Sequence, residues 1–417
     1  MRKPFVVYWL KQPTPYFIER CNAIAARDRV ELEVWFNARR ESDRSWDVDE
    51  SAWRFRARYI PTRKLLGREN RLPLPELRQR RPDLLVQEYD RPYLALGLLA
   101  ARTGAGRTAF RVLTNFDAWS ERTWWRELSK HVLFRAVDGA KVGGHDGAAL
   151  ARRYGLPRAR TWDVTQAVDV RHFASAATVG RDERERARRG LGLTGVVLIY
   201  VGRLWDGKGV DGLLDAYAAL KRSGEDVSLL VVGDGADERK YRTRAHGLTG
   251  VAFAGFAQRD RLPFFYALAD VMVFPTLGDP NGLVVEEALA AGLPVVSSSA
   301  AGNIERRLPA GGPGLIYPVG DVGALTDAMR SLVADGDLRR AMASRALDAV
   351  RHMDPDRYAD DFERFAHGVL DGPPRRTIAA AASWIAGSAL ARYGGRAMAP
   401  AAPFVSGPAA ATQRLTD

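Results

Sequence analysis

The chain has 417 residues, more than one ordinary hydrophobic core accommodates, so we expect two domains. Hydrophobic residues make up 46% and charged residues 27%, a balance normal for a globular protein and unlike that of a wholly disordered chain. The formal net charge of +12 favours acidic partners: phosphates, nucleotides, anionic lipid or nucleic acid. GC-rich coding explains an Arg-rich composition equally well, so charge alone does not choose among these partners.

The single cysteine, Cys21, excludes an internal disulfide and suggests a reducing compartment. It lies in the helical-looking segment YFIERCNAIAAR, which favours a buried structural thiol over a nucleophile. The basic N-terminus, MRKPFVVYWL, has a short apolar run typical of a first buried strand rather than of a signal peptide. No stretch of about 18 apolar residues occurs, so we expect no membrane-spanning helix.

Apolar runs alternate with amphipathic segments along the chain. In the first half, strands are predicted at PFVVYWL (4–10), VELEVWF (30–36) and DLLVQEY (83–89). In the second half they are predicted at GVVLIYVG (195–202), VSLLVVGDG (227–235), VAFAGF (251–256), VMVFPT (271–276) and LPVVSSS (293–299). Helical patterns such as GVDGLLDAYAALKRSG (209–224) separate them. The alternation runs twice, which predicts two α/β, Rossmann-like, doubly wound domains facing a cleft.

Composition shifts suggest the domain boundaries. We place the first domain at residues 1–175 and the second at residues 190–370, because the polar, Arg-rich stretch near residues 174–192 has the character of a linker. Residues 371–417 are low in complexity and rich in Ala, Gly and Pro, which predicts a largely disordered tail, with one weak helical pattern over residues 376–393.

One candidate site follows the first strand of the second half. In YVGRLWDGKGVDGLL, a strand runs into Gly202, and Arg203 and Lys208 lie in the glycine-containing loop that precedes a helix. Glycines allow the backbone to approach a ligand closely, and two cations suit a diphosphate. The alternative is an ordinary turn with solvated cations.

A second candidate site lies in GDPNGLVVEEALAAGLPVV. A helix is predicted from Leu283, and its first free N–H groups, together with Gly282 and the helix dipole, form an anion site. Asp279 before the helix and Glu287 within it are placed to accept hydrogen bonds from two polyols on either side of a diphosphate. The alternatives are an N-capping Asp279 and a Glu287 that only satisfies the dipole, with Glu286 as its exposed partner.

These motifs together resemble the donor domain of the retaining GT-B glycosyltransferases of the family-4 type, the glycosyl transferases group 1. The acidic-x7-Glu element corresponds to Asp279 and Glu287, and the GR…KG element to Gly202-Arg203 and Lys208-Gly209. The resemblance covers about residues 195–370. The family's first acid is usually Glu, so Asp279, one methylene shorter, bears on which donor sugar is used.

The resemblance implies sugar transfer from a nucleotide-diphosphate sugar to an acceptor hydroxyl with retention, in cell-surface polysaccharide, glycolipid or glycoconjugate synthesis. It implies that Arg203, Lys208 and the helix N-terminus at Gly282–Leu283 neutralise the departing diphosphate. Glu287 then holds the ribose, and Asp279 the sugar. Protein cations replace a metal, so no cofactor is expected. The implied location is the cytoplasm, at the inner face of the plasma membrane, with a glycan or lipid-linked acceptor.

The first half resembles the family's acceptor domain only loosely. The segment LKQPTPYFIERC stands where a glycine-rich loop is common, and LTNFDAWSERTWW lacks the histidine that often faces the donor sugar. Asn115 or Asp117 is expected in its place, and His131 and His145, the nearest histidines, are expected to be structural or exposed. A D-x-D pattern, Asp47–Asp49, lies in a polar stretch and is not expected to bind metal.

Residues 116–135, FDAWSERTWWRELSKHVLFR, mix Trp with Arg and Lys. They are interpreted either as a contact with an anionic membrane surface or acceptor lipid, or as an amphipathic helix with its Trp residues in the core. Two other functions stay open. One is a catalytically silent nucleotide-sugar-binding subunit. The other is nucleic-acid binding, which we do not expect because no known module occurs and the Arg residues are scattered.

Overall fold

The computed structural model describes residues 2–39, 46, 49–61, 63–65, 68–70, 73–88, 105–112, 124–164, 166–375 and 405–406. The chain divides into two compact units: the first comprises Met1–Ala167 with Pro355–Asp417, and the second Val168–Asp354. The boundaries differ from those expected at 1–175 and 190–370. Residues 168–190 belong to the second unit, and residues 355–370 return to the first.

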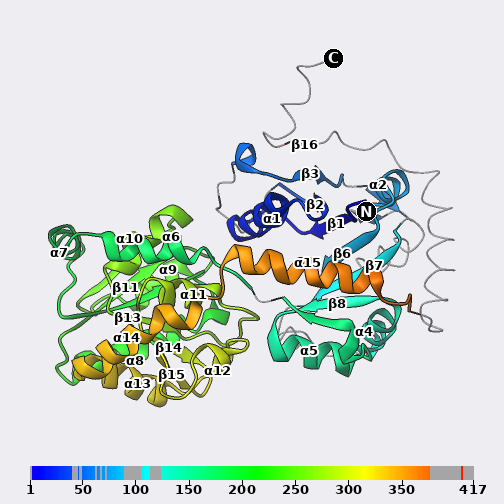
Figure 1. The fold of residues 1–417 in the computed structure, drawn as a ribbon. Coiled ribbons are helices and arrows are strands. Elements are labelled where there is room, and N and C mark those ends of the chain that lie inside the picture. Colours follow the sequence, from blue (N-terminus) through cyan, green and yellow to red (C-terminus); the bar gives the residue numbers. More distant parts are fainter. Residues whose placement is uncertain are drawn as a thin grey trace, which may run out of the picture. The chain divides into compact units, whose positions relative to one another are not determined.

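The first unit is built on a parallel sheet (Figure 1). Its strand order is β16-β3-β2-β1-β6-β7-β8-β9, and among the described strands of this sheet only β16 pairs antiparallel. The strands are β1 (Phe5–Leu10), β2 (Glu31–Phe36), β3 (Arg56–Tyr59), β6 (Leu84–Glu88), β7 (Arg107–Val112), β8 (Gly139–Val142), β9 (Thr161–Asp163) and β16 (Val405–Ser406). A separate antiparallel pair joins β4 (Arg63–Leu65) and β5 (Arg68–Asn70).

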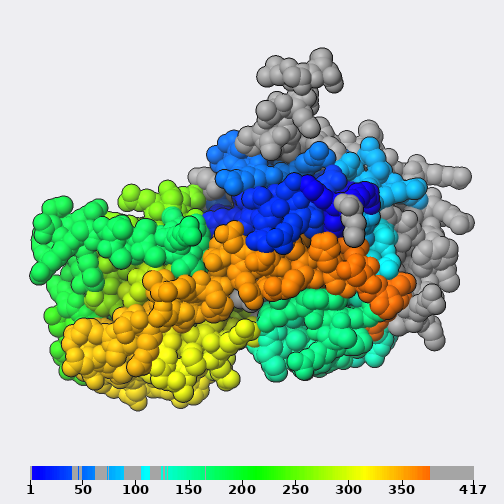
Figure 2. Space-filling view, in the orientation of Figure 1, coloured from blue at the N-terminus to red at the C-terminus, as the bar shows by residue number. Residues whose placement is uncertain are grey.

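Helices cover both faces of this sheet. They are α1 (Pro15–Arg27), α2 (Leu74–Arg80), α4 (Trp124–Ala136), α5 (Gly144–Arg153) and α15 (Pro355–Asp371), with short 3-10 turns η1 (Glu50–Ala52) and η3 (Arg158–Arg160). The orange helix α15 lies between blue α1 and the teal segment that carries α5 (Figures 1 and 2). It packs against α1 through a core that includes Tyr8, Ile24, Tyr358 and Phe362. Helix α15, which follows the second unit in sequence, therefore belongs to the core of the first unit.

The second unit has a six-stranded, wholly parallel sheet. Its strands are β10 (Val196–Val201), β11 (Val227–Val232), β12 (Val251–Gly255), β13 (Val271–Phe274), β14 (Val295–Ser298) and β15 (Gly314–Tyr317). They lie in the order β12-β11-β10-β13-β14-β15. Counted within the unit this is 3-2-1-4-5-6, the doubly wound order that binds ligands at the point where the order reverses, between β10 and β13.

Helices cover both faces of the second sheet. They are α6 (Val170–Ala174), α7 (Arg181–Gly190), α8 (Val210–Arg222), α9 (Glu238–Arg244), α10 (Leu262–Ala267), α11 (Leu283–Ala290), α12 (Ile304–Arg307), α13 (Val322–Ala334) and α14 (Gly336–Val350). Three 3-10 turns join them: η4 (Ser175–Thr178), η5 (Asp206–Lys208) and η6 (Arg259–Arg261). One core packs α6, α10, α11 and α14 on one face, and another packs α8 and α13 on the opposite face. Alternate residues of the continuous apolar strands supply both cores.

The Arg-rich stretch near residues 174–192 is not an extended linker. It forms η4 and α7, and the Arg184 and Arg188 guanidiniums pair with Asp270 at 2.7 and 2.8 Å. Because arginine pairs fasten α7 to the end of α10 and to β13, the charge run is a helix face of the second unit.

Most of the tail, including the weak helical pattern at 376–393, lies outside the described residues. No helix in the described part of the chain is both long and apolar enough to cross a membrane.

Candidate functional site

The two candidate loops meet at the switch point of the second sheet. The loop after β10 carries Lys208, and the loop after β13 carries Asp279. β10 and β13 are hydrogen-bonded parallel neighbours, so their carboxyl ends lie side by side. The Leu277 amide donates to the Gly207 carbonyl at 3.1 Å, which ties one loop to the other. The loop after β14 joins them, because the Gly302 amide donates to the Asp279 carbonyl at 2.8 Å.

Lys208 and Asp279 form an ion pair between Nζ and Oδ2. Their side chains are 14% and 16% exposed, so the pair is largely shielded from water yet reachable from the surface. Burial alone would raise the pKa of Asp279, but the Lys208 charge and hydrogen bonds from Lys208, Asn281 and Gly282 outweigh it and lower the pKa below its ordinary value. Asp279 is therefore a carboxylate at neutral pH.

Asp279 also shapes the start of α11. Its Oδ1 accepts hydrogen bonds from the amides of Asn281 at 2.9 Å and Gly282 at 2.6 Å. Gly282 is the N-cap residue, with a left-handed φ of 55°, and a Cβ there would lie 2.7 Å from the Phe274 ring. Only glycine fits this position. The amides of the first helical turn, from Leu283 onward, have no acceptor within the helix and form a partial positive charge.

The two glutamates of α11 are both buried, and they point to different partners. Glu287 is fully buried and accepts a hydrogen bond from the Tyr266 hydroxyl at 2.8 Å. It was expected to face the ligand, so a contact between Glu287 and a ribose stays a prediction. Glu286 was considered as an exposed partner, and this is wrong: it is 2% exposed and pairs with Arg307 at 3.0 Å.

Gly202 and Arg203 lie between β10 and Lys208. The Arg203 guanidinium lies 5.6 Å from the centre of the Trp205 ring, and the Arg203 carbonyl accepts from the Tyr200 hydroxyl at 2.7 Å. Burial, first, and then the charges of Tyr241 and Asp279 raise the pKa of Tyr200 well above its ordinary value, whereas Arg203 opposes the rise. Tyr200 therefore interacts electrostatically with both Arg203 and Asp279.

The loop after β10 requires its last glycine. Gly209 has a left-handed φ of 69°, and a Cβ there would lie 2.0 Å from the Pro275 carbonyl oxygen. Lys208 lies directly before this contact, so the close packing of the two loops fixes its backbone. Of the predicted residues, the structure brings together Lys208, Asp279 and the start of α11. Arg203 lies in the same loop as Lys208, and Glu287 is buried within α11.

Comparison with known proteins identifies the family of this chain. A model of the family "Glycosyl transferases group 1" matches residues 181–348. The GDP-mannose-dependent alpha-(1-6)-phosphatidylinositol monomannoside mannosyltransferase of Mycobacterium tuberculosis is 30% identical over 302 residues, covering 67% of this chain and 75% of that protein. The chain belongs to the group 1 glycosyltransferases. A phosphatidyl-myo-inositol mannosyltransferase of Mycobacterium leprae is 36% identical over 163 residues, 38% of this chain and 43% of that protein.

Solved structures show the fold of this glycosyltransferase. Sucrose-phosphate synthase from Thermosynechococcus elongatus superposes with a TM-score of 0.71 at 19% identity, over 88% of this chain and 99% of that one. HepE from Anabaena in complex with UDP superposes with a TM-score of 0.69 at 18% identity, over 88% and 99% of the two chains. The predicted α/β fold class, with two Rossmann-like domains of the GT-B type, is confirmed.

The sequence did not reveal two residues that organise the glycosyltransferase's candidate site. Arg307, only 8% exposed, donates to the carbonyls of Asn281 at 2.7 Å and Gly282 at 3.2 Å. Tyr266, on α10, holds Glu287. Neither residue belongs to a local motif: Arg307 follows Glu286 by 21 positions, and Tyr266 precedes Glu287 by 21.

The first unit buries three cations on one face of its sheet, which the sequence also did not reveal. Lys141 on β8 is 2% exposed and donates to the Tyr358 hydroxyl at 2.8 Å. Arg111 on β7 pairs with Glu88, and Arg20 on α1 donates to the Ala167 carbonyl. Burial, followed by the charges of Arg111 and Arg20, lowers the pKa of Lys141 well below its ordinary value of 10.5.

The other expected residues of the first unit are distributed as follows. Asn115, Asp117 and Asp47 lie outside the described residues. His145 has a side chain 82% exposed, and His131 packs edge-on against Tyr154, with 5.1 Å between ring centres, as expected of structural or exposed histidines. Asp49 of the D-x-D pattern accepts from the Ser51 amide at 2.9 Å and caps η1.

Burial settles the role of Cys21. It is 1% exposed, and burial raises the pKa of its thiol to about 12, so the expected structural thiol is confirmed.

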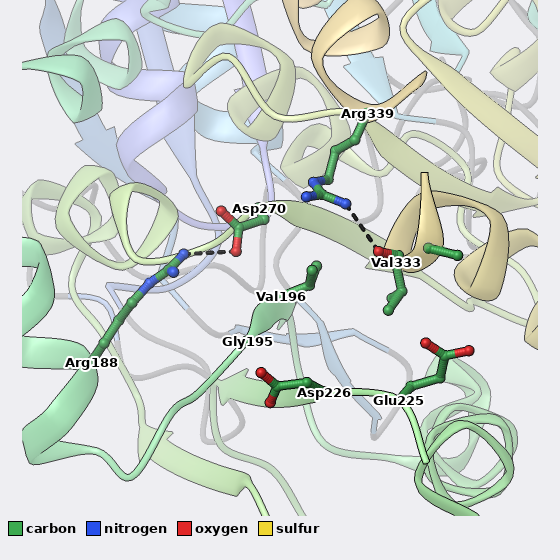
Figure 3. Close-up of a pocket in the computed structure, with 9 residues that line it drawn as sticks. Arg188, Gly195, Val196, Glu225, Asp226, Asp270, Val333 and Arg339 are labelled. Atoms are coloured by element: carbon green, nitrogen blue, oxygen red, sulfur yellow. Dashed lines mark hydrogen bonds and ion pairs between the residues drawn. The ribbon is translucent and has the colours of Figure 1, made fainter. Parts of the chain in front are cut away.

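The second unit has a surface pocket (Figure 3), and none of its lining residues belongs to these loops. Val196, which begins β10, and Asp226, which precedes β11, line it, so it lies at the amino ends of the strands. Arg188 enters it paired with Asp270, and Arg339 donates to the Val333 carbonyl at 3.2 Å. The candidate site is at the opposite, carboxyl edge of the sheet. Among the described residues, no cluster of three or more His, Cys, Asp or Glu could hold a metal ion.

Proposed function

We propose that this glycosyltransferase moves a sugar from a nucleotide-diphosphate sugar to an acceptor hydroxyl with retention of configuration. The observation that carries the proposal is the Lys208–Asp279 pair at the N-terminus of α11, at the switch point of the second sheet. This is where doubly wound sheets bind nucleotides. A cation and a carboxylate in contact there fit the junction at which a sugar joins a phosphate.

Charge develops on the leaving diphosphate mainly in the transition state. Lys208, Arg203 and the amides that begin at Gly282–Leu283 are proposed to stabilise that charge, and donors fixed in advance lower the barrier most. Asp279 is proposed to accept hydrogen bonds from the sugar hydroxyls, because it remains ionised. Glu287 would bind the ribose by exchanging the Tyr266 hydroxyl for a ribose hydroxyl. With protein cations in this role, the reaction is proposed to need no metal.

For the donor, GDP-mannose is the first candidate, since the M. tuberculosis relative is named for its dependence on it. A uridine nucleotide is the second, since HepE was solved with UDP and with UDP-glucose. For the acceptor we propose a glycan or lipid-linked hydroxyl in cell-surface polysaccharide, glycolipid or glycoconjugate synthesis, on the inner face of the plasma membrane. The names of the two mycobacterial relatives support a lipid acceptor.

A thermal-shift panel of UDP, GDP, ADP and their sugars tests the donor site. A ligand at about 100 times its dissociation constant adds about 2.7 kcal/mol to the free energy of unfolding, so the matching nucleotide should raise Tm clearly. Donor hydrolysis, followed by NMR of the anomeric proton, then tests transfer chemistry and retention. Repeating it in EDTA tests independence of metal. No shift with any of these nucleotides would refute the proposed donor site.

We also propose that α4 contacts an anionic membrane surface. Trp124, Leu128 and Val132 are 78%, 56% and 40% exposed, and their spacing of four places them on one face of the helix. Trp124 therefore does not lie in the core, against one of the two earlier interpretations. Arg135 is exposed on the same helix, and Arg153 approaches it by pairing with Glu127 at 3.8 Å. Apolar side chains bordered by cations suit an anionic interface.

Vesicle flotation tests this contact. The Trp124→Ser/Leu128→Ser variant should lose binding to vesicles that contain phosphatidylglycerol. A control variant, Val319→Ser, removes an apolar side chain 46% exposed in the second unit and should bind as the wild type does. Equal flotation of both variants would refute the role of α4.

A further inference from the structure

Arg307 connects the loops that form the proposed donor site. It ends the short helix α12, and its guanidinium reaches back to the start of α11. One terminal nitrogen donates to the carbonyls of Asn281 at 2.7 Å and Gly282 at 3.2 Å. The other donates to the carbonyl of Gly302, in the loop after β14. One side chain thus holds the backbone of two loops in a fixed relation.

The same guanidinium meets the carboxylate of Glu286 at 3.0 and 3.1 Å. The Arg307 and Glu286 side chains are 7% and 2% exposed, so both charges are buried. A buried ion pair is weak support for stability, because removing two charges from water can cost as much as their attraction returns. The pair instead fixes the orientation of the groups around it, because a planar guanidinium directs its N–H donors along fixed lines.

Arg307 and Asp279 hold the same turn from opposite sides. Asp279 accepts hydrogen bonds from the amides of Asn281 and Gly282, and Arg307 donates hydrogen bonds to the carbonyls of the same two residues. With both sides of a peptide group held, its plane cannot rotate freely. The direction of the next amides, which open α11, is fixed in consequence.

Arg307 also sets the rotation of the first turn of α11. Successive residues of an α-helix point about 100° apart, because 3.6 residues make one turn. With Glu286 held against Arg307, the next residue, Glu287, is directed towards Tyr266. Glu287, the residue that we propose to bind the ribose, is therefore oriented by the ion pair of its neighbour Glu286.

We infer that Arg307 is a positioning residue of the donor site. It contacts protein groups and not the donor, and it holds the N-terminus of α11 and Glu287 in the orientation that binds the nucleotide diphosphate. The inference rests on the proposed function, because it assigns the arrangement to nucleotide binding.

The decisive variant replaces the ion pair with apolar side chains. Arg307→Met combined with Glu286→Leu removes the carbonyl contacts, yet such replacements of a buried pair often leave stability unchanged or raised. The carbonyls of Asn281, Gly282 and Gly302 lose a donor, so we expect the double variant to fold with a lowered Tm, and we assay it well below that temperature. A displacement of the reacting groups by about 1 Å lowers turnover about 100-fold, so we expect a loss of that order in kcat, with a Kd for UDP or GDP raised about tenfold.

Two single variants complete the test. Arg307→Lys keeps the charge but cannot span the two loops, and should lower kcat similarly. Arg188→Lys is the matched control: Arg188 also bridges a carboxylate, Asp270, and a carbonyl, that of Leu268, but at the opposite edge of the sheet. It should lower Tm and leave both kcat and the Kd for UDP and GDP unchanged.

The outcomes separate the inference from the proposed function. If the wild type binds neither UDP nor GDP, the proposed function fails. If the wild type binds one of them and the apolar double variant binds and turns over equally well, Arg307 serves stability alone and the inference is overturned. A double variant that is folded at the assay temperature and has lost nucleotide affinity, while Arg188→Lys with its own lowered Tm keeps that affinity, supports it.

Discussion

Asp279→Asn separates the two contacts that Asp279 makes. The Asn side chain keeps an oxygen for the amides of Asn281 and Gly282, which donate to Asp279 Oδ1 at 2.9 and 2.6 Å in the wild type. It replaces the other oxygen, which pairs with Lys208, by an NH₂ group. A donor then faces a donor, and the Lys208 ammonium loses its counter-ion while the turn before α11 remains capped.

The structure sets the size of the effect on stability. Exposed pairs contribute about 0.2–1 kcal/mol, and loss of one partner from a buried pair costs about 3–5 kcal/mol. With side chains 14% and 16% exposed, the Lys208–Asp279 pair lies between these limits. We expect Asp279→Asn to lower the free energy of unfolding by about 2–3 kcal/mol. Asp279→Ala also loses two amide hydrogen bonds and should cost about 2 kcal/mol more.

Urea unfolding, nucleotide titration and a transfer assay measure the three consequences. Asp279→Asn should bind the nucleotide diphosphate nearly as the wild type does, yet lose transfer from the intact sugar donor by at least about 100-fold, as loss of a preorganised contact does. Asp321→Asn is the control: Asp321 caps α13 by accepting from the Ala324 amide at 2.9 Å, and Asn caps about as well as Asp.

Normal transfer by Asp279→Asn would refute the reasoning, because it would reduce Asp279 to a cap. A stability loss equal to that of Asp321→Asn would refute the ion pair's contribution. The low pKa of Asp279 adds a further check. The stability that the Asp279 carboxylate contributes is present above its ordinary pKa of 3.8 and is lost as the pH falls through the lower, folded value. The free energy of unfolding of Asp279→Asn should therefore depend less on pH than that of the wild type, and only in strongly acidic solution.

Three further predictions follow from single contacts. Glu287→Gln should weaken binding of the nucleotide diphosphate by about 1–3 kcal/mol in calorimetric titration, and unchanged affinity would contradict a ribose contact. Lys141→Met should raise the free energy of unfolding at pH 7 by about 1–3 kcal/mol, because it removes a buried cation. Since the pKa of Lys141 is lowered from 10.5, wild-type stability should rise with pH up to that value, and urea melts of the variant should show a smaller rise. Gly209→Ala should destabilise the second unit by more than the left-handed backbone cost of about 1–2 kcal/mol, because its Cβ would lie 2.0 Å from the Pro275 oxygen, and an unchanged Tm would contradict this.

Strand prediction succeeded where one local signal sufficed. The runs that became β1, β10 and β11 are continuous and rich in Val, Leu and Ile, as strands buried on both faces are. β7 and β8 were not predicted, because RTAFRV and GAKV carry charged residues that local patterning assigns to the surface. Arg111 and Lys141 are nevertheless buried, since Glu88 and Tyr358, distant in sequence, accept their hydrogen bonds.

The candidate site, too, was predicted only in part from the sequence. Lys208 and Asp279 were found because each follows a strand and precedes a helix, and parallel strands bring such loops to one edge of the sheet. The burial of both α11 glutamates was not predictable, because it depends on Tyr266 and Arg307 from other elements. The return of α15 to the first unit was likewise missed: an amphipathic pattern shows that a helix has a buried face, and not which sheet buries it.

Pairing the site's lysine with an acid has a physical rationale in the unliganded protein. A lysine side chain has about 2 kcal/mol of rotamer entropy to lose when it is fixed. Asp279 already fixes Lys208 before a donor arrives, so little further order is lost when a diphosphate binds. Arg307 fixes the neighbouring backbone in a comparable way, through the carbonyls of Asn281 and Gly282. Charge neutralisation and preorganisation are thus supplied by the same contacts, and for that reason the acid at position 279 should matter to transfer as well as to folding.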